Sequence, residues 1–146
     1  MFTVSRLDLY VDVQGWWPTG DDRYRFVCRG QTLETYEASG ELTGFSFGRR
    51  KTGTIVARIY DKTRDADRKG SDFWLDVWGE RLDPAKPVFR VEFELARTAL
   101  REYGLDTVDD VLGAVPALWL SVTSEWLTYR SPTADQTRAR WPVAPE

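Results

Sequence analysis

The sequence predicts an α+β fold in which an antiparallel sheet has helices packed on one face and leaves its other face open for a site. Three observations support this prediction: stretches that alternate apolar and polar residues, one hairpin signature, and two helical stretches in the C-terminal half. Strands and helices do not alternate regularly along the chain, which disfavours a parallel α/β sheet.

The first strand is predicted over residues 4–13, where polar and apolar positions alternate with the period of a half-buried strand. The apolar positions are Leu7, Leu9, Val11 and Val13, and the polar ones are Arg6, Asp8, Tyr10 and Asp12. Glycines and a proline end this strand. We then expect a short helix over residues 21–29 and favour a helix over residues 30–40.

A β-hairpin is predicted over residues 43–62, because two alternating runs flank a turn with three consecutive cations and Gly53. On its second strand one face carries Ile55, Ala57 and Ile59, and the other carries Val56, Arg58, Tyr60 and Lys62. Beyond the hairpin we expect a charged loop over residues 63–71 and a short helix over residues 72–80.

A third strand is predicted over residues 86–97, with Arg90, Glu92 and Glu94 on its polar face. It runs into a helix that ends at Gly104. A longer helix begins after Thr107, and Pro116 should kink or split it. We expect residues 1–130 to form the folded domain, cut from something longer, and residues 131–146 to form a Pro-rich basic arm or linker.

The composition excludes several kinds of chemistry. The chain has 146 residues, enough for one domain, and contains no histidine, so serine–histidine hydrolysis and histidine-bound metals are excluded. Its single cysteine excludes an internal disulfide. The net charge of −3 argues against a uniformly basic DNA-coating protein. Without a membrane-spanning run or a signal peptide, a cytoplasmic protein is expected.

The three strands place charges around a tyrosine, if they neighbour one another. The carboxylates are Asp8, Asp12, Glu92 and Glu94. Carboxylate oxygens suit Mg²⁺ or Mn²⁺, which can offset charge that develops during phosphoryl transfer. Tyr60 is a competent nucleophile towards phosphorus, and Arg58 or Lys62 could lower its pKa and bind the phosphate. Together these residues predict a site that nicks and rejoins a phosphodiester.

Plainer interpretations remain open for each of these residues. Alternating charges on a strand are typical of a solvated face, and Tyr60 alone is typical of an ordinary sheet residue. The cations Arg49, Arg50 and Lys51 suit a soluble hairpin tip as well as a phosphate clamp. The whole chain also fits a non-catalytic module that binds single-stranded nucleic acid, or an interaction domain.

The segments "SRLDLYVD", "TGFSFGRRKTGTIVARIYDKTRD" and "FRVEFELAR", in this order and spacing, resemble the plasmid rolling-circle replication initiators of the Rep_trans type. The resemblance extends to actinobacterial and phage-borne relatives and to conjugative relaxases. Relaxases share the same chemistry, so a conjugative relaxase is an alternative to a replication initiator. It covers roughly Ser5 to Arg97, and the tail is also similar. Complete initiators of this type are usually longer than this chain.

The resemblance implies a nickase that joins covalently to the 5′ phosphate of an origin through a tyrosine and needs a divalent metal ion. The matching nucleophile is Tyr60, followed by Lys62, and the matching acidic residues are Asp8 and Glu92. Glu94 and Asp12 are further metal candidates, whereas the role of Asp65 is open because many members have glutamate there. The expected DNA contacts are Arg49, Arg50, Lys51 and Arg90. The expected partners are single-stranded or cruciform origin DNA and a host helicase, with no membrane.

Overall fold

The computed structural model describes residues 2–49 and 54–145. Its strands are β1 (Arg6–Val13), β2 (Phe26–Cys28), β3 (Leu33–Ala38), β4 (Glu41–Phe47), β5 (Ile55–Asp61), β6 (Phe89–Ala96) and β7 (Leu127–Tyr129). Its helices are α1 (Lys62–Lys69), α2 (Phe73–Trp78), α3 (Arg97–Glu102) and α4 (Val108–Ser121). Short 3₁₀ turns lie at Gly20–Arg25, Gly79–Arg81 and Arg138–Arg140, and a π-helical turn lies at Val122–Trp126.

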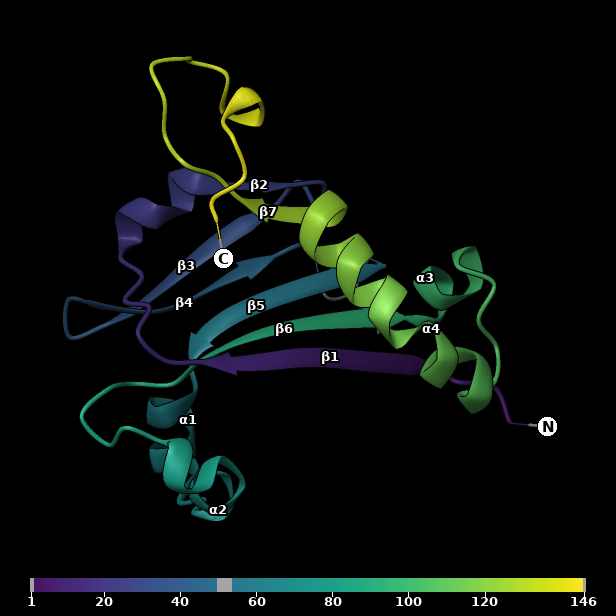
Figure 1. The fold of residues 1–146 in the computed structure, drawn as a ribbon, viewed down its shortest axis with the longest axis horizontal. Helices are drawn as coiled ribbons and strands as arrows, with labels where there is room; N and C mark the ends of the chain where they lie inside the picture. The colour runs from purple at the N-terminus through teal and green to yellow at the C-terminus, as the bar shows by residue number, and fades with distance from the viewer. Residues whose placement is uncertain (1, 50–53, 146) are drawn as a thin grey trace.

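Five strands form one antiparallel sheet in the order β1-β6-β5-β4-β3, and β2 pairs with β7 in a separate two-stranded sheet. Helices α3 and α4 lie on one side of the large sheet, while α1 and α2 extend from the opposite side at its other end (Figure 1). The predicted α+β class is therefore confirmed. In the part of the chain that the structure describes, no helix is long and apolar enough to cross a membrane.

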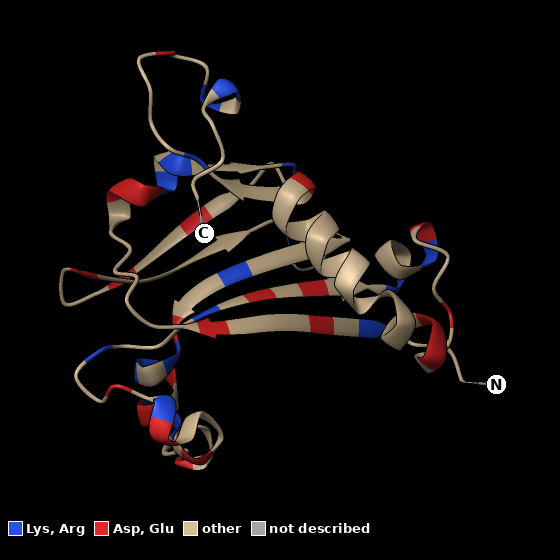
Figure 2. Cartoon of the chain, viewed as in Figure 1, with Lys and Arg blue, Asp and Glu red and all other residues tan. Residues whose placement is uncertain are grey.

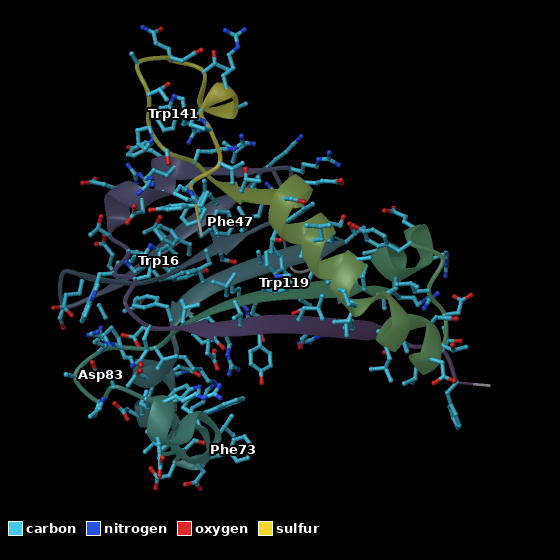
Figure 3. All side chains as sticks on the ribbon, in the orientation of Figure 1. Trp16, Phe47, Phe73, Asp83, Trp119 and Trp141 are labelled. Carbon is cyan, nitrogen blue, oxygen red and sulfur yellow. The ribbon has the colours of Figure 1, made fainter. Side chains whose placement is uncertain are left out.

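The core lies between the sheet and α4. Phe93 and Leu95 of β6 are almost fully buried on this face, as are Leu118 and Val122 near the end of α4. The rings of Phe93 and Trp119 meet edge to face with their centroids 5.6 Å apart, and Figure 3 shows Trp119 pointing from α4 towards the sheet. Burial of this apolar face leaves the alternate residues of each strand on the opposite face.

The helix favoured over residues 30–40 was wrong, because these residues contain β3 and its turn into β4. Ser39 and Gly40 both adopt positive φ angles of 54° and 77°, which close the hairpin tightly. The partner strand β4 therefore decides the conformation, since the polar segment itself has no strong apolar period.

The charged loop expected over residues 63–71 was also wrong, because most of it is α1. Asp61 caps this helix by accepting a hydrogen bond from the Arg64 amide at 3.0 Å, and Gly70 ends it in the left-handed conformation. The short helix expected over residues 72–80 is confirmed as α2.

The C-terminal region differs from the expectation in one respect. Pro116 lies inside α4 without splitting it, and the chain continues through the π-helical turn into β7. Beyond β7 the chain returns on itself, because Arg130 forms a β-bridge with Val143 and the indole of Trp141 donates a 2.7 Å hydrogen bond to the Asp135 carbonyl.

Candidate functional site

Three adjacent strands, β5, β6 and β1, carry charged residues along their length (Figure 2). The residues that alternate with the core residues of these strands form rows of mostly polar side chains on the sheet face opposite α4. Each row runs from β5 through β6 to β1: the first holds Tyr60, Arg90 and Asp12, the second holds Arg58, Glu92 and Tyr10, and the third holds Val56, Glu94 and Asp8. The three strands are neighbours in the sheet, as the predicted site requires. The rows also fix which charges lie near which tyrosine.

Tyr60 lies in the last full row of β5, one residue before Asp61 ends the strand. Burial raises the pKa of its phenol, and the charge of Glu92 raises it further, while Arg90 and Arg58 offset only part of the shift. Arg58 therefore lowers this pKa, as expected, but the net shift is upward. The cause is that the half-buried phenol lies beside the carboxylate of Glu92.

Arg58 and Glu92 form the ion pair next to Tyr60. The Arg58 Nη2 donates to Glu92 Oε2 at 2.6 Å, and the Arg58 guanidinium lies 5.8 Å from the centre of the Tyr60 ring. Because a third of the Arg58 side chain stays exposed, the cation can still meet a phosphate that approaches Tyr60.

Asp8 and Glu94 lie opposite each other on β1 and β6 and share one cation, Arg6. The Arg6 Nη2 is 2.6 Å from Asp8 Oδ2 and 3.4 Å from Glu94 Oε2. The longer contact lacks hydrogen-bond geometry, so the buried Glu94 Oε2 has no hydrogen-bond partner among the described residues. We call Asp8, Glu92 and Glu94 the acidic side of the sheet face.

Asp12 and Arg90 are joined in a two-bond ion pair, with both contacts at 2.8 Å. Arg90 is only 4% exposed, and its guanidinium lies between the rings of Tyr10 at 3.9 Å and Trp74 at 4.1 Å. The Trp78 indole donates to Asp12 at 3.0 Å. Burial raises the pKa of Asp12, but the hydrogen bonds from Arg90 and Trp78 outweigh it and lower the pKa. This cluster fastens α2 to the sheet, so neither residue is placed as a free metal ligand or DNA contact.

Lys62 follows β5 and is buried against two aromatic rings. Its Nζ lies 5.8 Å from the Tyr60 ring centre, 4.8 Å from that of Trp74, and 3.1 Å from Asp65 Oδ2. Asp65 also accepts from Arg68 and Lys69, at 3.2 and 3.1 Å. Asp65, whose role was open, therefore holds three cations of α1 in position: Lys62, Arg68 and Lys69.

A groove of about 670 Å³ lies beside Tyr60, between α1 and the strands β3 and β4, and we call it the α1 groove. Its lining includes Arg58, Tyr60, Arg64, Arg68, Lys69, Asp61, Asp65, Tyr36, Ala38, Gly44 and Ser46. Gly44 lies directly opposite Tyr60, and a β-carbon there would come within 2.6 Å of the Ile59 carbonyl oxygen and 3.0 Å of the Tyr60 β-carbon. The absence of a side chain at Gly44 thus lets β4 approach Tyr60 closely.

Two parts of the site were not predicted from the sequence. Tyr10 lies opposite Glu92, is 48% exposed, and is therefore a second tyrosine on this face; its place in the alternating first strand was the available signal. The α1 groove depends on a helix predicted as a loop. Of the predicted hairpin cations, Arg49 is exposed, whereas Arg50 and Lys51 lie outside the described residues.

The four predicted metal ligands do not gather around Tyr60. Along one strand face residues repeat about every 6.8 Å and strands lie about 4.8 Å apart, so the Tyr60 backbone is about 8 Å from that of Glu92, about 14 Å from Glu94 and about 17 Å from Asp8. Within residues 2–49 and 54–145, no group of three or more potential metal-ligating side chains is close enough to hold an ion.

The donor chemistry suits a divalent ion, but the position does not suit catalysis at Tyr60. Asp8 and Glu94 offer oxygen ligands, and Glu94 Oε2 is unpartnered. Mg²⁺ is often held by one or two carboxylates together with water and phosphate. An ion on this pair would lie beside Tyr10, two rows from Tyr60. Only Glu92 of the predicted ligands borders Tyr60.

The comparisons with known proteins agree with this fold. No known protein family and no curated protein matched the chain. Among solved structures, the chain is similar to a rolling circle replication initiator protein from Geobacillus stearothermophilus, with a TM-score of 0.57 and 23% sequence identity. The match covers 98% of this chain and 52% of that one, so the chain spans about half the length of that initiator. The shared fold agrees with the sequence resemblance to rolling-circle replication initiators.

Proposed function

We propose that this domain initiates DNA replication by nicking and rejoining one strand of origin DNA, with Tyr60 as the covalent nucleophile. The observation that carries the proposal is the position of Tyr60, at the edge of a groove whose cations can bind phosphate. The fold shared with a solved initiator supports the same conclusion. Origin recognition and helicase recruitment remain expectations from the sequence resemblance.

The proposed step is a direct exchange at phosphorus. The Tyr60 Oη attacks the phosphodiester, the bond from phosphorus to the 3′ oxygen breaks, and the 3′ oxygen leaves as a hydroxyl after taking a proton from water. The phenol gives its own proton to water in the groove. The DNA 5′ phosphate is then held on the tyrosine, and attack by a 3′ hydroxyl reverses every bond change and frees Tyr60.

The cations near Tyr60 would bind and orient the phosphate. Arg58 is close enough to the ring to contact a phosphate oxygen while it keeps Glu92 as its partner. Lys62 is 6% exposed and held by Asp65, so its role is to support the ring and the start of α1. We expect a requirement for Mg²⁺ or Mn²⁺, but we derive no step from the ion because only Glu92 of its predicted ligands borders Tyr60.

Covalent trapping tests this proposal. Supercoiled DNA with candidate origins is incubated with the protein and Mn²⁺, with and without a chelator, and denaturing gels report the protein–DNA adduct. We expect an adduct with wild type and with the Tyr10→Phe control, and none with Tyr60→Phe, because the phenylalanine ring keeps the packing and lacks the nucleophile. An adduct of normal yield with Tyr60→Phe would refute the assignment.

A second candidate function is a non-catalytic module that binds single-stranded DNA. The specific observation in its favour is the raised pKa of Tyr60 beside Glu92, which disfavours the phenolate. This candidate predicts that single-strand affinity is present in both tyrosine variants and that no adduct forms with any of the three proteins.

A further inference from the structure

We infer that the α1 groove is the track that holds the single DNA strand next to the cleaved phosphate, so that DNA reaches Tyr60 over β4 and β3 and not over β1. The inference rests on the proposed function in one respect: it places the cleaved phosphate of the DNA at Tyr60. It adds a binding surface and a direction of approach that the sequence did not indicate.

The charge of the groove is the first argument. Among the described residues that line it, Arg58, Arg64, Arg68 and Lys69 are cationic and Asp61 and Asp65 are acidic, a surplus of two positive charges. The whole chain has a net charge of −3. A phosphate backbone is attracted to such a local positive surface even when the protein as a whole is acidic.

The arrangement of the cations is the second argument. Arg68 and Lys69 are 74% and 58% exposed, yet both are held by hydrogen bonds to the largely buried carboxylate of Asp65. Arg64 contacts Glu41 on β4 at 3.1 Å across the groove rim. Arg64, Arg68 and Lys69 are thus fixed along one wall, available to solvent, and spaced over about one and a half turns of α1.

The floor of the groove is the third argument. Gly44 adds no side chain and Ser46 only a small one, so the space above β4 stays open up to the Tyr60 ring. Tyr36 on β3 is 50% exposed and borders the same space, and an aromatic ring of this kind can stack against a nucleobase.

The β1 side of Tyr60 offers no comparable path. There Arg90 is enclosed by Tyr10, Trp74 and Asp12, and the next rows carry the acidic side. A DNA backbone would meet carboxylates on that side and cations on the groove side. The direction of approach follows from this difference.

The test places a single charge at the groove rim. Ala38 is exposed and lines the groove, whereas Ala117 is exposed on α4 on the opposite side of the sheet. In a Tyr60→Phe background, binding of a fluorescein-labelled oligothymidylate of about 12 nucleotides is measured by anisotropy. We expect Ala38→Glu to weaken and Ala38→Lys to tighten binding, each about threefold at low salt. The same changes at Ala117 should shift binding far less.

A second variant reads out the number of phosphate contacts. Replacing both Arg64 and Arg68 with alanine should lower the slope of log affinity against log salt by about 1.4, since each contact with a single strand contributes about 0.7. Thermal unfolding checks that the variant stays folded. An unchanged slope, or equal effects of the charge pairs at Ala38 and Ala117, would overturn the inference.

The outcomes also separate the inference from the proposed function. If DNA binding depended on the groove but the wild-type protein formed no covalent adduct, the α1 groove would stand as the DNA track and Tyr60 would be ruled out as the nucleophile. If the groove variants changed neither the yield of the adduct nor the affinity for DNA, the nucleophile assignment would stand and the α1 groove would be ruled out as the track.

Discussion

Two tyrosines share the polar face of the sheet, and their surroundings differ in sign. Tyr60 borders the α1 groove, with its surplus of cations. Tyr10 lies opposite Glu92 on a strand that also carries Asp8, and Arg90 stacks on one face of its ring. A phosphodiester is an anion, so the groove side attracts it and the acidic side repels it. Under the proposed function, the position of cations, more than the position of carboxylates, is therefore the reason to propose Tyr60 and not Tyr10 as the nucleophile.

The largest expected effect comes from a substitution in the floor of the α1 groove. Gly44→Ala should destabilise the fold by about 3 kcal/mol and abolish adduct formation, because the new methyl group collides with the backbone of β5 beside Tyr60. Chemical denaturation measures the stability.

The matched control is Gly113→Ala in α4, where a β-carbon meets no atom within 4 Å. There we expect a stabilisation of up to about 1 kcal/mol from helix propensity. A harmless Gly44→Ala would show that the close approach of β4 to Tyr60 is not needed.

An intermediate effect on stability is expected for the ion pair that separates the surroundings of Tyr60 from those of Tyr10. Asp12→Asn should cost about 2 kcal/mol, since it removes a charge from the largely buried pair with Arg90. By contrast, Glu41→Gln breaks only the exposed pair with Arg64 and should cost less than about 0.5 kcal/mol. Equal losses of stability in the two variants would contradict the contrast between the enclosed Asp12–Arg90 pair and the exposed Glu41–Arg64 pair.

The pH dependence of the Asp12 effect has a defined sign. The pKa of Asp12 is lowered in the folded protein from its ordinary value of 3.8, so the carboxylate stabilises the fold above that pH. This contribution is lost as the pH falls through the folded pKa. The stability difference between wild type and Asp12→Asn should therefore shrink below about pH 4, and a constant difference would argue against the ion pair.

The smallest expected effect concerns the acidic side. Arg6 offsets part of the negative charge of Asp8 and Glu94, and half of its side chain is exposed. Arg6→Gln should therefore raise Mn²⁺ affinity about threefold, as expected for the loss of an exposed ion pair. Electron paramagnetic resonance of free Mn²⁺ measures the change, with Arg101→Gln on α3 as control. Identical affinities in both variants would show that this pair does not bind the ion.

Much of the fold could be predicted because residue alternation reports directly on strand faces. It gave β1, β5 and β6 and placed Tyr60, Arg58 and Glu92 on one face. The pairing of strands, which decides distances between side chains, is not encoded in the local pattern. The separation of Tyr60 from Asp8 and Glu94 therefore emerged only from the register.

Other features depended on contacts between distant segments. Helix α1 is so highly charged that its composition resembles a loop, although Asp61 and Gly70 supply its caps. The buried stack of Arg90 requires Trp74 from a separate helix. Neither the groove nor this stack has a signature within a single stretch of sequence.

Mass spectrometry of the trapped adduct tests the central claim most directly. After trypsin, cleavage behind Arg58 and Lys62 releases residues 59–62, which contain Tyr60 as their only tyrosine, whereas Tyr10 lies in residues 7–23. The account predicts that the nucleotide mass is found on residues 59–62. A nucleotide on residues 7–23 would place the nucleophile on the acidic side and contradict the account.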